Sequence, residues 1–393
     1  MLKHAKRSAW YSIFLVFFPA VLTAQTFVYT NNDLAAPGNS VSAFAVDSSG
    51  KMSQVSGSPF STGGLGHGGG LYSSNRIIPV GNFLFASNAG DNTVSAFTID
   101  SISGGLTLVS GSPFPIQGLD NPSESGISLA ATPDGKFLYA ATTDGNITIL
   151  SIGASGALTI AASAPVAAGG PIANLKVSPD GNYLVAAIIG LTKEIQVFTI
   201  RPDGSLRAIH KPFVFSSDYA TGVDINCGSN LVYAGTASGN IYVFNLNSKN
   251  GHLTSVAGSP FATGLQSNQV VALSADDATL FSSNQGGNTV TAFVVNADGS
   301  LVVPGTSAST AGNSGLSNSY PGGLAVSQDG QFLFAADNVG DASGNAGVTS
   351  FLLNSLSSPL TFGSLASTGI VSQLHSVAAY PAKVCTAAVL PSH

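Results

Sequence analysis

One repeating unit constrains this chain more than any other feature, because it recurs seven times. The unit is clearest between residues 126 and 170, where four short apolar runs are separated by turn sequences such as Pro133-Asp134-Gly135 and Ala154-Ser155-Gly156. Asp tolerates turn geometry and Gly adopts positive φ, so these sequences predict tight turns between antiparallel strands. No segment after residue 24 shows helical periodicity with capping residues. We therefore expect each unit to be a four-stranded meander, with strands a to d.

The spacing of the units predicts the architecture. The aromatic and aliphatic run of strand b recurs at intervals of about 50 residues, starting at Phe27, Phe83, Phe137, Tyr183, Leu231, Thr279 and Phe332. This period, with four strands per unit, is typical of a β-propeller, and seven copies predict seven blades. The first unit lacks a strand a, whereas a further strand-a-like run, His375 to Pro381, follows the last unit. We expect this C-terminal strand to complete the first blade and close the ring, which leaves no open edge.

The first 24 residues are typical of an export signal. Basic residues precede an apolar run, Ala9 to Leu22, which ends in small residues. The alternative is a membrane anchor, but the run is short for a span and contains Pro19. We predict a signal peptide over residues 1–24, a single propeller over 25–384 and a tail over 385–393, in a secreted or periplasmic protein.

The charge of the chain excludes several classes of partner. Only 8% of the residues are charged and the formal net charge is −6, with no basic cluster after the N-terminal segment. Nucleic acid is therefore not expected as a partner, and neither is a membrane once the signal is removed. The histidines lack metal-ligand spacing and the Asp-Gly turns lack calcium-loop spacing, so we expect no metal and no cofactor. We expect a monomer.

The two cysteines of the chain, Cys227 and Cys385, fall in different repeats. We therefore predict two free thiols rather than a disulfide. An exported protein would meet an oxidising compartment, which leaves a disulfide as the alternative.

Loop residues at the expected channel mouth are the first candidates for a site, because the d–a and b–c loops of a propeller gather there. The d–a loops contribute His67, Glu124 and His375 as catalytic candidates and Asp218 as a ligand-binding candidate. His67 lies in the run GGLGHGGG, and glycines let backbone N–H groups approach a ligand closely. The alternative is a flexible loop with a solvated histidine. The b–c loops add the carboxylates Asp33, Asp91, Asp144, Glu194 and Asp337.

The inner strands provide the second set of candidates. Aligning them on their a–b turns places seven residues at one level around the channel: Arg76, Ala130, Lys176, Asp224, Ala272, Ala325 and Ala378. We expect Lys176 and Asp224, on adjacent blades, to form an ion pair, and we assign both to ligand binding together with Arg76. Arg76 has no acid at this level, so either a carbonyl or water neutralises it or it binds an anion.

Several motifs resemble those of a known family. The runs FVYTNN and FLFASNAGDNTVSAFTID, with the order PDG-x-FLYA, V-x-AF-x-ID and G-x-L-x-x-V-x-GSPF, resemble the YVTN-type repeats of lactonase-like seven-bladed propellers. That family includes propeller-type 6-phosphogluconolactonases, so the resemblance implies their fold more strongly than their activity. The family's lactonases carry a Pro-Arg-His run at the start of inner strands. The matching positions read Gly126-Ile127-Ser128, Pro321-Gly322-Gly323 and Leu374-His375-Ser376, and none keeps the Arg-His pair.

Two functions from different classes follow. The missing Arg-His pair and the weakly charged loops predict a secreted binding or scaffold propeller, with a small-molecule or protein ligand at the channel mouth. The alternative is a periplasmic hydrolase of a lactone or sugar-acid lactone, similar to 6-phosphogluconolactonase. In that enzyme His67, Glu124 or His375 would activate water, and Arg76 would hold a carboxylate or phosphate.

Overall fold

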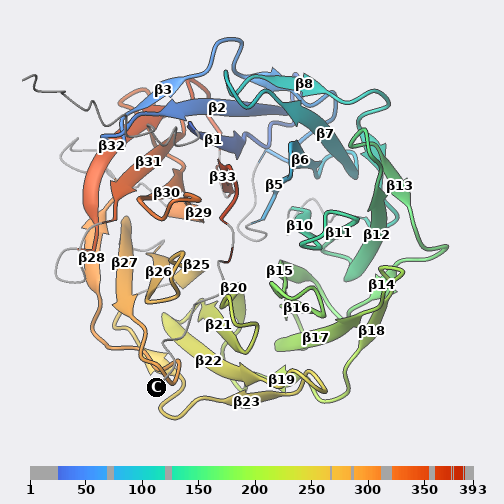
Figure 1. Ribbon diagram of the computed structural model, residues 1–393, viewed down its shortest axis with the longest axis vertical. Coiled ribbons are helices and arrows are strands. Elements are labelled where there is room, and N and C mark those ends of the chain that lie inside the picture. The colour runs from blue at the N-terminus through green and yellow to red at the C-terminus, as the bar shows by residue number, and fades with distance from the viewer. Residues whose placement is uncertain are drawn as a thin grey trace, which may run out of the picture.

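The computed structural model describes residues 25–68, 75–119, 126–265, 268–284, 287–310, 321–353, 359–372, 374, 376–383 and 385. The strands of these residues form seven antiparallel sheets around a central channel (Figure 1). The prediction of an all-β, seven-bladed propeller is confirmed. The predicted signal segment, residues 1–24, lies outside the described residues.

Each blade is built from four strand positions, named a to d from the channel outward. The inner strands a are β33 (Val377–Tyr380), β5 (Ile77–Val80), β10 (Ser128–Ala131), β15 (Ile172–Val177), β20 (Ala220–Ile225), β25 (Asn268–Leu273) and β29 (Pro321–Val326). The strands b are β1 (Thr26–Asn31), β6 (Phe83–Asn88), β11 (Phe137–Ala141), β16 (Tyr183–Ile188), β21 (Leu231–Thr236), β26 (Thr279–Asn284) and β30 (Phe332–Asp337). The strands c are β2 (Ser40–Val46), β7 (Thr93–Ile99), β12 (Asn146–Ile152), β17 (Glu194–Ile200), β22 (Asn240–Leu246), β27 (Thr289–Val294) and β31 (Gly347–Leu352).

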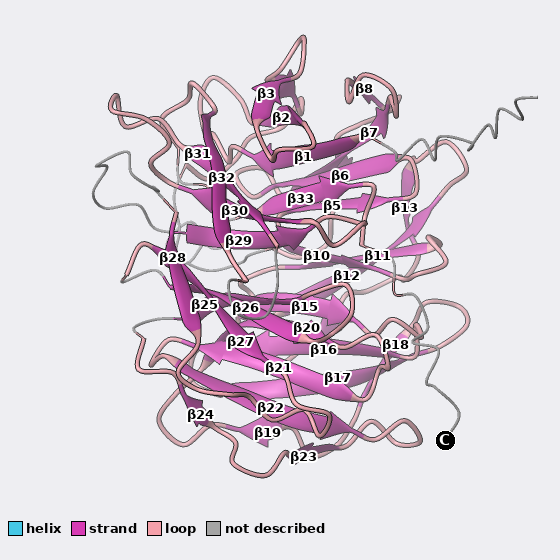
Figure 2. Cartoon of the chain, turned by 60° about the vertical axis from the view of Figure 1, so that its left-hand side comes forward, coloured by secondary structure: helices cyan, strands magenta, loops and turns pink. Residues whose placement is uncertain are grey.

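The outer strands d are β3 (Met52–Gln54), β8 (Leu106–Leu108), β13 (Leu158–Ile160), β18 (Leu206–Ala208), β23 (Leu253–Ser255), β28 (Thr306–Ser309) and β32 (Thr361–Ser367). In five blades a second short segment also pairs with strand c: β4 (Phe60–Ser61), β9 (Phe114–Pro115), β14 (Val166–Ala167), β19 (Phe213–Val214) and β24 (Phe261–Ala262). Figure 2 shows this arrangement of strands and loops from the side. The described residues contain no helix long and apolar enough to cross a bilayer.

The repeated Gly-Ser-Pro-Phe sequence explains the break in the outer strand. Between the two segments of strand d, Ser58 Oγ accepts the backbone N–H of Ala43 in strand c at 2.9 Å. Ser112 and Ser259 make the same bond to Ala96 and Val243. The serine therefore satisfies a donor that the interrupted strand leaves unpaired. Pairing with strand c resumes immediately after the proline, in β4, β9 and β24.

Large apolar residues at the start of strand b pack on glycines in the c–d turn of the following blade. The Phe27 ring packs on Gly104 in the c–d turn of the following blade, where an added Cβ would lie 2.3 Å from the ring. Tyr29 Oη donates a hydrogen bond to the carbonyl of the same glycine at 2.9 Å. The equivalent Phe137–Gly204 and Leu231–Gly299 contacts are made in other blades, with matching bonds from Tyr139 and Tyr233. These glycines have positive φ, so both the turn and the close approach require them.

The C-terminal strand closes the ring as predicted. β33 pairs antiparallel with β1, with Phe27 opposite Tyr380 and Thr30 opposite Val377. On the other side of blade 1, Phe44 shares one hydrophobic cluster with Phe332 of blade 7. The C-terminal strand thus completes blade 1 by backbone pairing, and blade 1 packs on blade 7 through apolar side chains.

Candidate functional site

A buried ion pair lies at the end of the channel where the b–c and d–a loops gather. Arg76 directly precedes β5, and Asp33 follows β1 in the neighbouring blade. Arg76 Nη1 lies 2.5 Å from Asp33 Oδ2, and the side chains are only 1% and 3% exposed. Because a buried charge is costly unless it is paired, Asp33 is what allows Arg76 to be buried here.

The predicted position of Arg76 was wrong by two residues. In blade 2, Val80 pairs with Phe83 across a two-residue turn, whereas in blade 3 the six residues after Ala131 form a longer connection to its partner Leu138. Ile78 is therefore the residue at the predicted level of the channel, and Arg76 lies nearer the mouth. The prediction also named no acid for Arg76, whereas Asp33, in the b–c loop of the preceding blade, pairs with it.

The glycine-rich loop binds the backbone around Asp33. The N–H of His67 donates to Asp33 Oδ1 at 3.1 Å, and the N–H of Gly68 donates to the Asp33 carbonyl at 2.7 Å. A Cβ on Gly66 would lie 2.2 Å from the backbone of Asp33, so the close approach requires glycine. His67 is partly exposed. The loop thus places His67 beside the carboxylate that pairs with Arg76.

Buried asparagines hold the loop that carries Asp33. Asn39 Nδ2 donates to Asn31 Oδ1 at 2.9 Å and to Asn88 Oδ1 at 3.0 Å, while Asn39 Oδ1 accepts the N–H of Ser40. Asn31 Nδ2 donates to the Arg76 carbonyl at 3.2 Å. A satisfied buried network of this kind fixes loop geometry. Sequence reasoning missed it, although asparagine recurs at the end of three strands b.

The other predicted mouth residues do not join this pair within the described structure. Asp218 accepts the N–H of Tyr219 at 2.9 Å and of Ser238 at 3.3 Å, and the Ser238 hydroxyl donates to its other oxygen. Its carboxylate therefore fastens a d–a loop to a b–c turn, and its role in ligand binding stays a prediction. Burial raises the pKa of Glu194, at the start of β17. Glu124 and His375 lie outside the described residues.

Lys176 and Asp224 form the predicted ion pair at the opposite end of the channel, near the a–b turns. Lys176 Nζ lies 2.8 Å from Asp224 Oδ1, and the side chains are 41% and 6% exposed. Asp224 Oδ2 accepts the N–H of Leu273 in β25 at 2.9 Å. Burial acts to raise the pKa of Asp224, but the charges of Lys176 and Lys383 and these hydrogen bonds outweigh it, so the pKa lies below its ordinary value.

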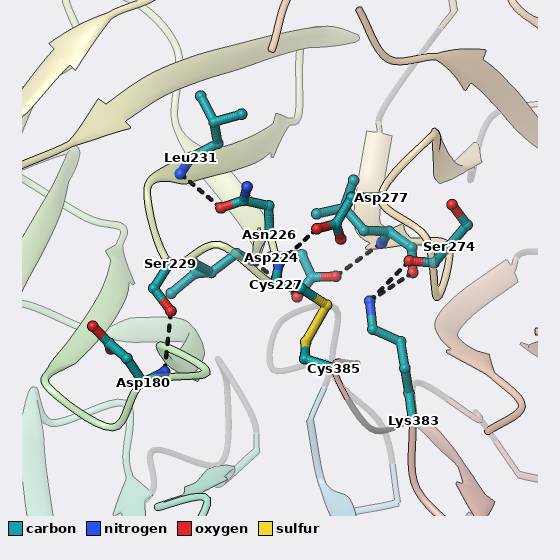
Figure 3. Close-up of a disulfide and its surroundings, with 12 residues drawn as sticks. Asp180, Asp224, Asn226, Cys227, Ser229, Leu231, Ser274, Asp277, Lys383 and Cys385 are labelled. Carbon is teal, nitrogen blue, oxygen red and sulfur yellow. Dashed lines mark hydrogen bonds between the residues drawn. A yellow bond between two sulfur atoms is a disulfide. The ribbon is translucent and has the colours of Figure 1, made fainter. Parts of the chain in front are cut away.

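Cys227 and Cys385 form a disulfide, with Cα atoms 5.2 Å apart and a sequence separation of 158. The prediction of two free thiols is therefore wrong. It failed because residues 381–383 and 385, here called the C-terminal strap, leave blade 1 and reach the a–b turn of blade 5 (Figure 3). Lys383 Nζ of the strap donates to the carbonyls of Leu273 and Ser274 at 3.0 and 3.2 Å.

The strap brings cation and carboxylates together beside the disulfide. Burial lowers the pKa of Lys383, and the charge of Asp224 partly offsets this effect. Asp277 accepts the N–H of Cys227 at 2.7 Å, and burial raises the pKa of its carboxyl. Throughout the described part of the chain, no three His, Cys, Asp or Glu side chains are placed to hold a metal ion.

Comparison with known proteins decides the family. The model of a family described as "Lactonase, 7-bladed beta-propeller" matches residues 15–171, 115–218, 159–263 and 229–338. The chain belongs to this family. Its candidate site residues, however, are divided between the two ends of this lactonase-family propeller, with Arg76 and His67 at one end and Lys176 and Asp224 at the other.

Solved structures share the fold at low sequence identity. A candidate 6-phosphogluconolactonase from Bacteroides fragilis is 20% identical, with a TM-score of 0.68 over 92% of this chain and 99% of its own. The periplasmic gluconolactonase PpgL of Pseudomonas aeruginosa is 19% identical, with a TM-score of 0.68 over 89% of this chain and 98% of its own. No curated protein matches the sequence.

The Lys176–Asp224 pair gives a stability prediction for the lactonase-family propeller. Asp224→Ala should lower the free energy of unfolding by about 2–4 kcal/mol, because it leaves the Lys176 ammonium and the Leu273 N–H without their acceptor. Lys176→Ala should cost about 1 kcal/mol or less, since Lys176 is well exposed. The double variant should lose less than the sum. Additive losses in denaturant unfolding would show that the residues do not interact.

The loss of stability caused by Asp224→Ala should depend on pH. Because the pKa of Asp224 is lower in the folded protein, its contribution is complete above about pH 4 and is lost as pH falls through the folded pKa. The stability difference between wild type and Asp224→Ala should therefore shrink in acid. A difference that stays constant from neutral pH to about pH 3 would contradict this assignment.

Proposed function

We propose that this lactonase-family propeller is an exported binding or scaffold protein that holds a ligand at its channel mouth and does not hydrolyse lactones. The observation that carries the proposal is the buried Arg76–Asp33 pair, in which the Arg76 side chain is only 1% exposed. A lactonase mechanism through Arg76 would need that guanidinium to reach a substrate carboxylate or phosphate. The absence of the family's Arg-His pair at Gly126, Pro321 and Leu374 supports the same conclusion.

Exposed leucine side chains on the loops around the channel mouth support a binding role. Carboxylates of the b–c turns fasten the d–a loops, because Asp91 accepts the N–H of Leu65 at 3.0 Å and Asp144 accepts that of Leu119 at 2.9 Å. The side chains of these leucines remain 43% and 64% exposed, and Leu191 in another b–c turn is fully exposed. Apolar side chains displayed on a fixed backbone favour contact with an apolar part of a ligand or partner protein.

Hydrolysis of a lactone or sugar-acid lactone is the second candidate. Family membership supports it, and so does the bond that ties the backbone of His67 to the acid of the Arg76–Asp33 pair. In this alternative His67, Glu124 or His375 would activate water, and Arg76 would exchange Asp33 for an anionic substrate group.

Export is part of the proposal. The basic and apolar N-terminal segment supports removal of residues 1–24, and the Cys227–Cys385 disulfide supports an oxidising compartment outside the cytosol. We expect the mature protein to be a monomer. N-terminal sequencing of exported protein should begin near Gln25, and a mature chain that begins at Met1 would contradict this part of the proposal.

A lactone assay separates the two functions. Purified mature protein should open sugar-acid γ- and δ-lactones, phosphorylated and unphosphorylated, no faster than buffer, as followed by proton release. Acceleration that His67→Ala abolishes without a change in melting temperature would establish the hydrolase instead. His252→Ala, in the exposed c–d turn of blade 5, is the matched control and should behave as wild type in either case.

A further inference from the structure

The C-terminal strap crosses the channel from one side of the ring to the other. It leaves β33, the inner strand of blade 1, at Tyr380, and Cys385 is bonded to Cys227 in the a–b turn of blade 5. Blades 1 and 5 lie on opposite sides of the ring, and the trace between them passes through its centre (Figure 1).

Lys383 attaches the middle of the strap to blade 6. Its ammonium donates to the carbonyls of Leu273 and Ser274 on blade 6 (Figure 3). The charges that act on it come from Asp224 on blade 5, from Asp276 and Asp277 in the a–b turn of blade 6, and from Lys176 on blade 4. The acids outnumber Lys176, so the surroundings attract the Lys383 cation. The strap therefore contacts blade 5 through the disulfide and blade 6 through Lys383.

We propose that the C-terminal strap is a disulfide-latched plug that closes the a–b end of the channel, and that reduction by a dithiol opens it. The thiolate of the dithiol attacks one sulfur of the Cys227–Cys385 bond and forms a mixed disulfide. Its second thiol then displaces the protein sulfur. Two electrons and two protons pass to the protein, which gains two thiols, and the reductant leaves as its own cyclic disulfide.

In this proposal, breaking the disulfide releases the strap but does not open the ring. The four β33–β1 residue pairs lie before the strap, so reduction leaves the ring closed. After reduction, the contacts of the strap that remain among the described residues are the Lys383 bonds and the nearby charges. The disulfide works as a tether that keeps Lys383 at a high effective concentration beside its carbonyls, and this advantage is lost when the tether is cut. Opening would take Lys383 away from Asp224, whose side chain is 6% exposed when the strap is in place, whereas Lys176 is already 41% exposed.

Amine labelling at Lys383 tests the plug. Oxidised wild type and the Cys227→Ser/Cys385→Ser variant are reacted briefly with an acetylating reagent, and each lysine is quantified by peptide mass spectrometry. Labelling of Lys383 should rise by roughly tenfold or more in the variant, because the tether no longer holds the amine at a high effective concentration beside its carbonyls. Exposed Lys249 should label equally in both proteins. Release would also return the pKa of Lys383 toward its ordinary value and reduce its free amine, so an increase reports access.

Two results would overturn the proposal. Equal protection of Lys383 in both proteins would show that the disulfide is not the latch, and equal reactivity would show that the strap is not seated when oxidised. Circular dichroism of the variant must match wild type. If the variant does not fold, wild type treated with dithiothreitol under native conditions replaces it, with labelling compared before and after reduction and the same two results decisive.

Discussion

The backbone pairing of β33 with β1 is the interaction on which the rest of this propeller depends. It joins Phe27 to Tyr380 and so closes a ring whose other blades are linked covalently in order. The same junction builds the mouth. Asp33 follows β1, while Ser376 precedes β33 and its Oγ accepts the N–H of Arg76 at 3.0 Å. A ring open at this point would lack the Ser376 hydroxyl that accepts the Arg76 N–H.

Buried charges are neutralised differently at the two ends of the channel. At the mouth, Arg76 and Asp33 neutralise one another between neighbouring blades and are shielded from solvent. At the a–b end, Asp224 pairs with partly exposed Lys176 and is also close to Lys383 of the strap. Each of these pairs joins two blades. Its charges are therefore neutralised only when both blades are in position.

The sequence predicted features that local turns and the repeat period determine. The seven blades followed from the recurrence of strand b, and the Lys176–Asp224 pair followed because blades 4 and 5 have a–b turns of equal length. Arg76 was misplaced because the a–b turn of blade 2 is shorter. Its partner Asp33 and the disulfide were missed for a different reason. The Arg76–Asp33 pair depends on a loop of the neighbouring blade, and the disulfide depends on a segment that crosses the channel. No local sequence pattern encodes either of these contacts.

Hydrogen exchange at the junction of the first and last strands tests the central claim most directly. If β33 completes blade 1, the amides of Val377–Tyr380 that pair with β1 should exchange only in the unfolding that also exposes Phe137–Ala141 of β11, and should be equally slow. Exchange of the β33 amides at much lower denaturant than those of β11 would contradict the account, because it would show a ring that opens at its junction while the other blades stay folded.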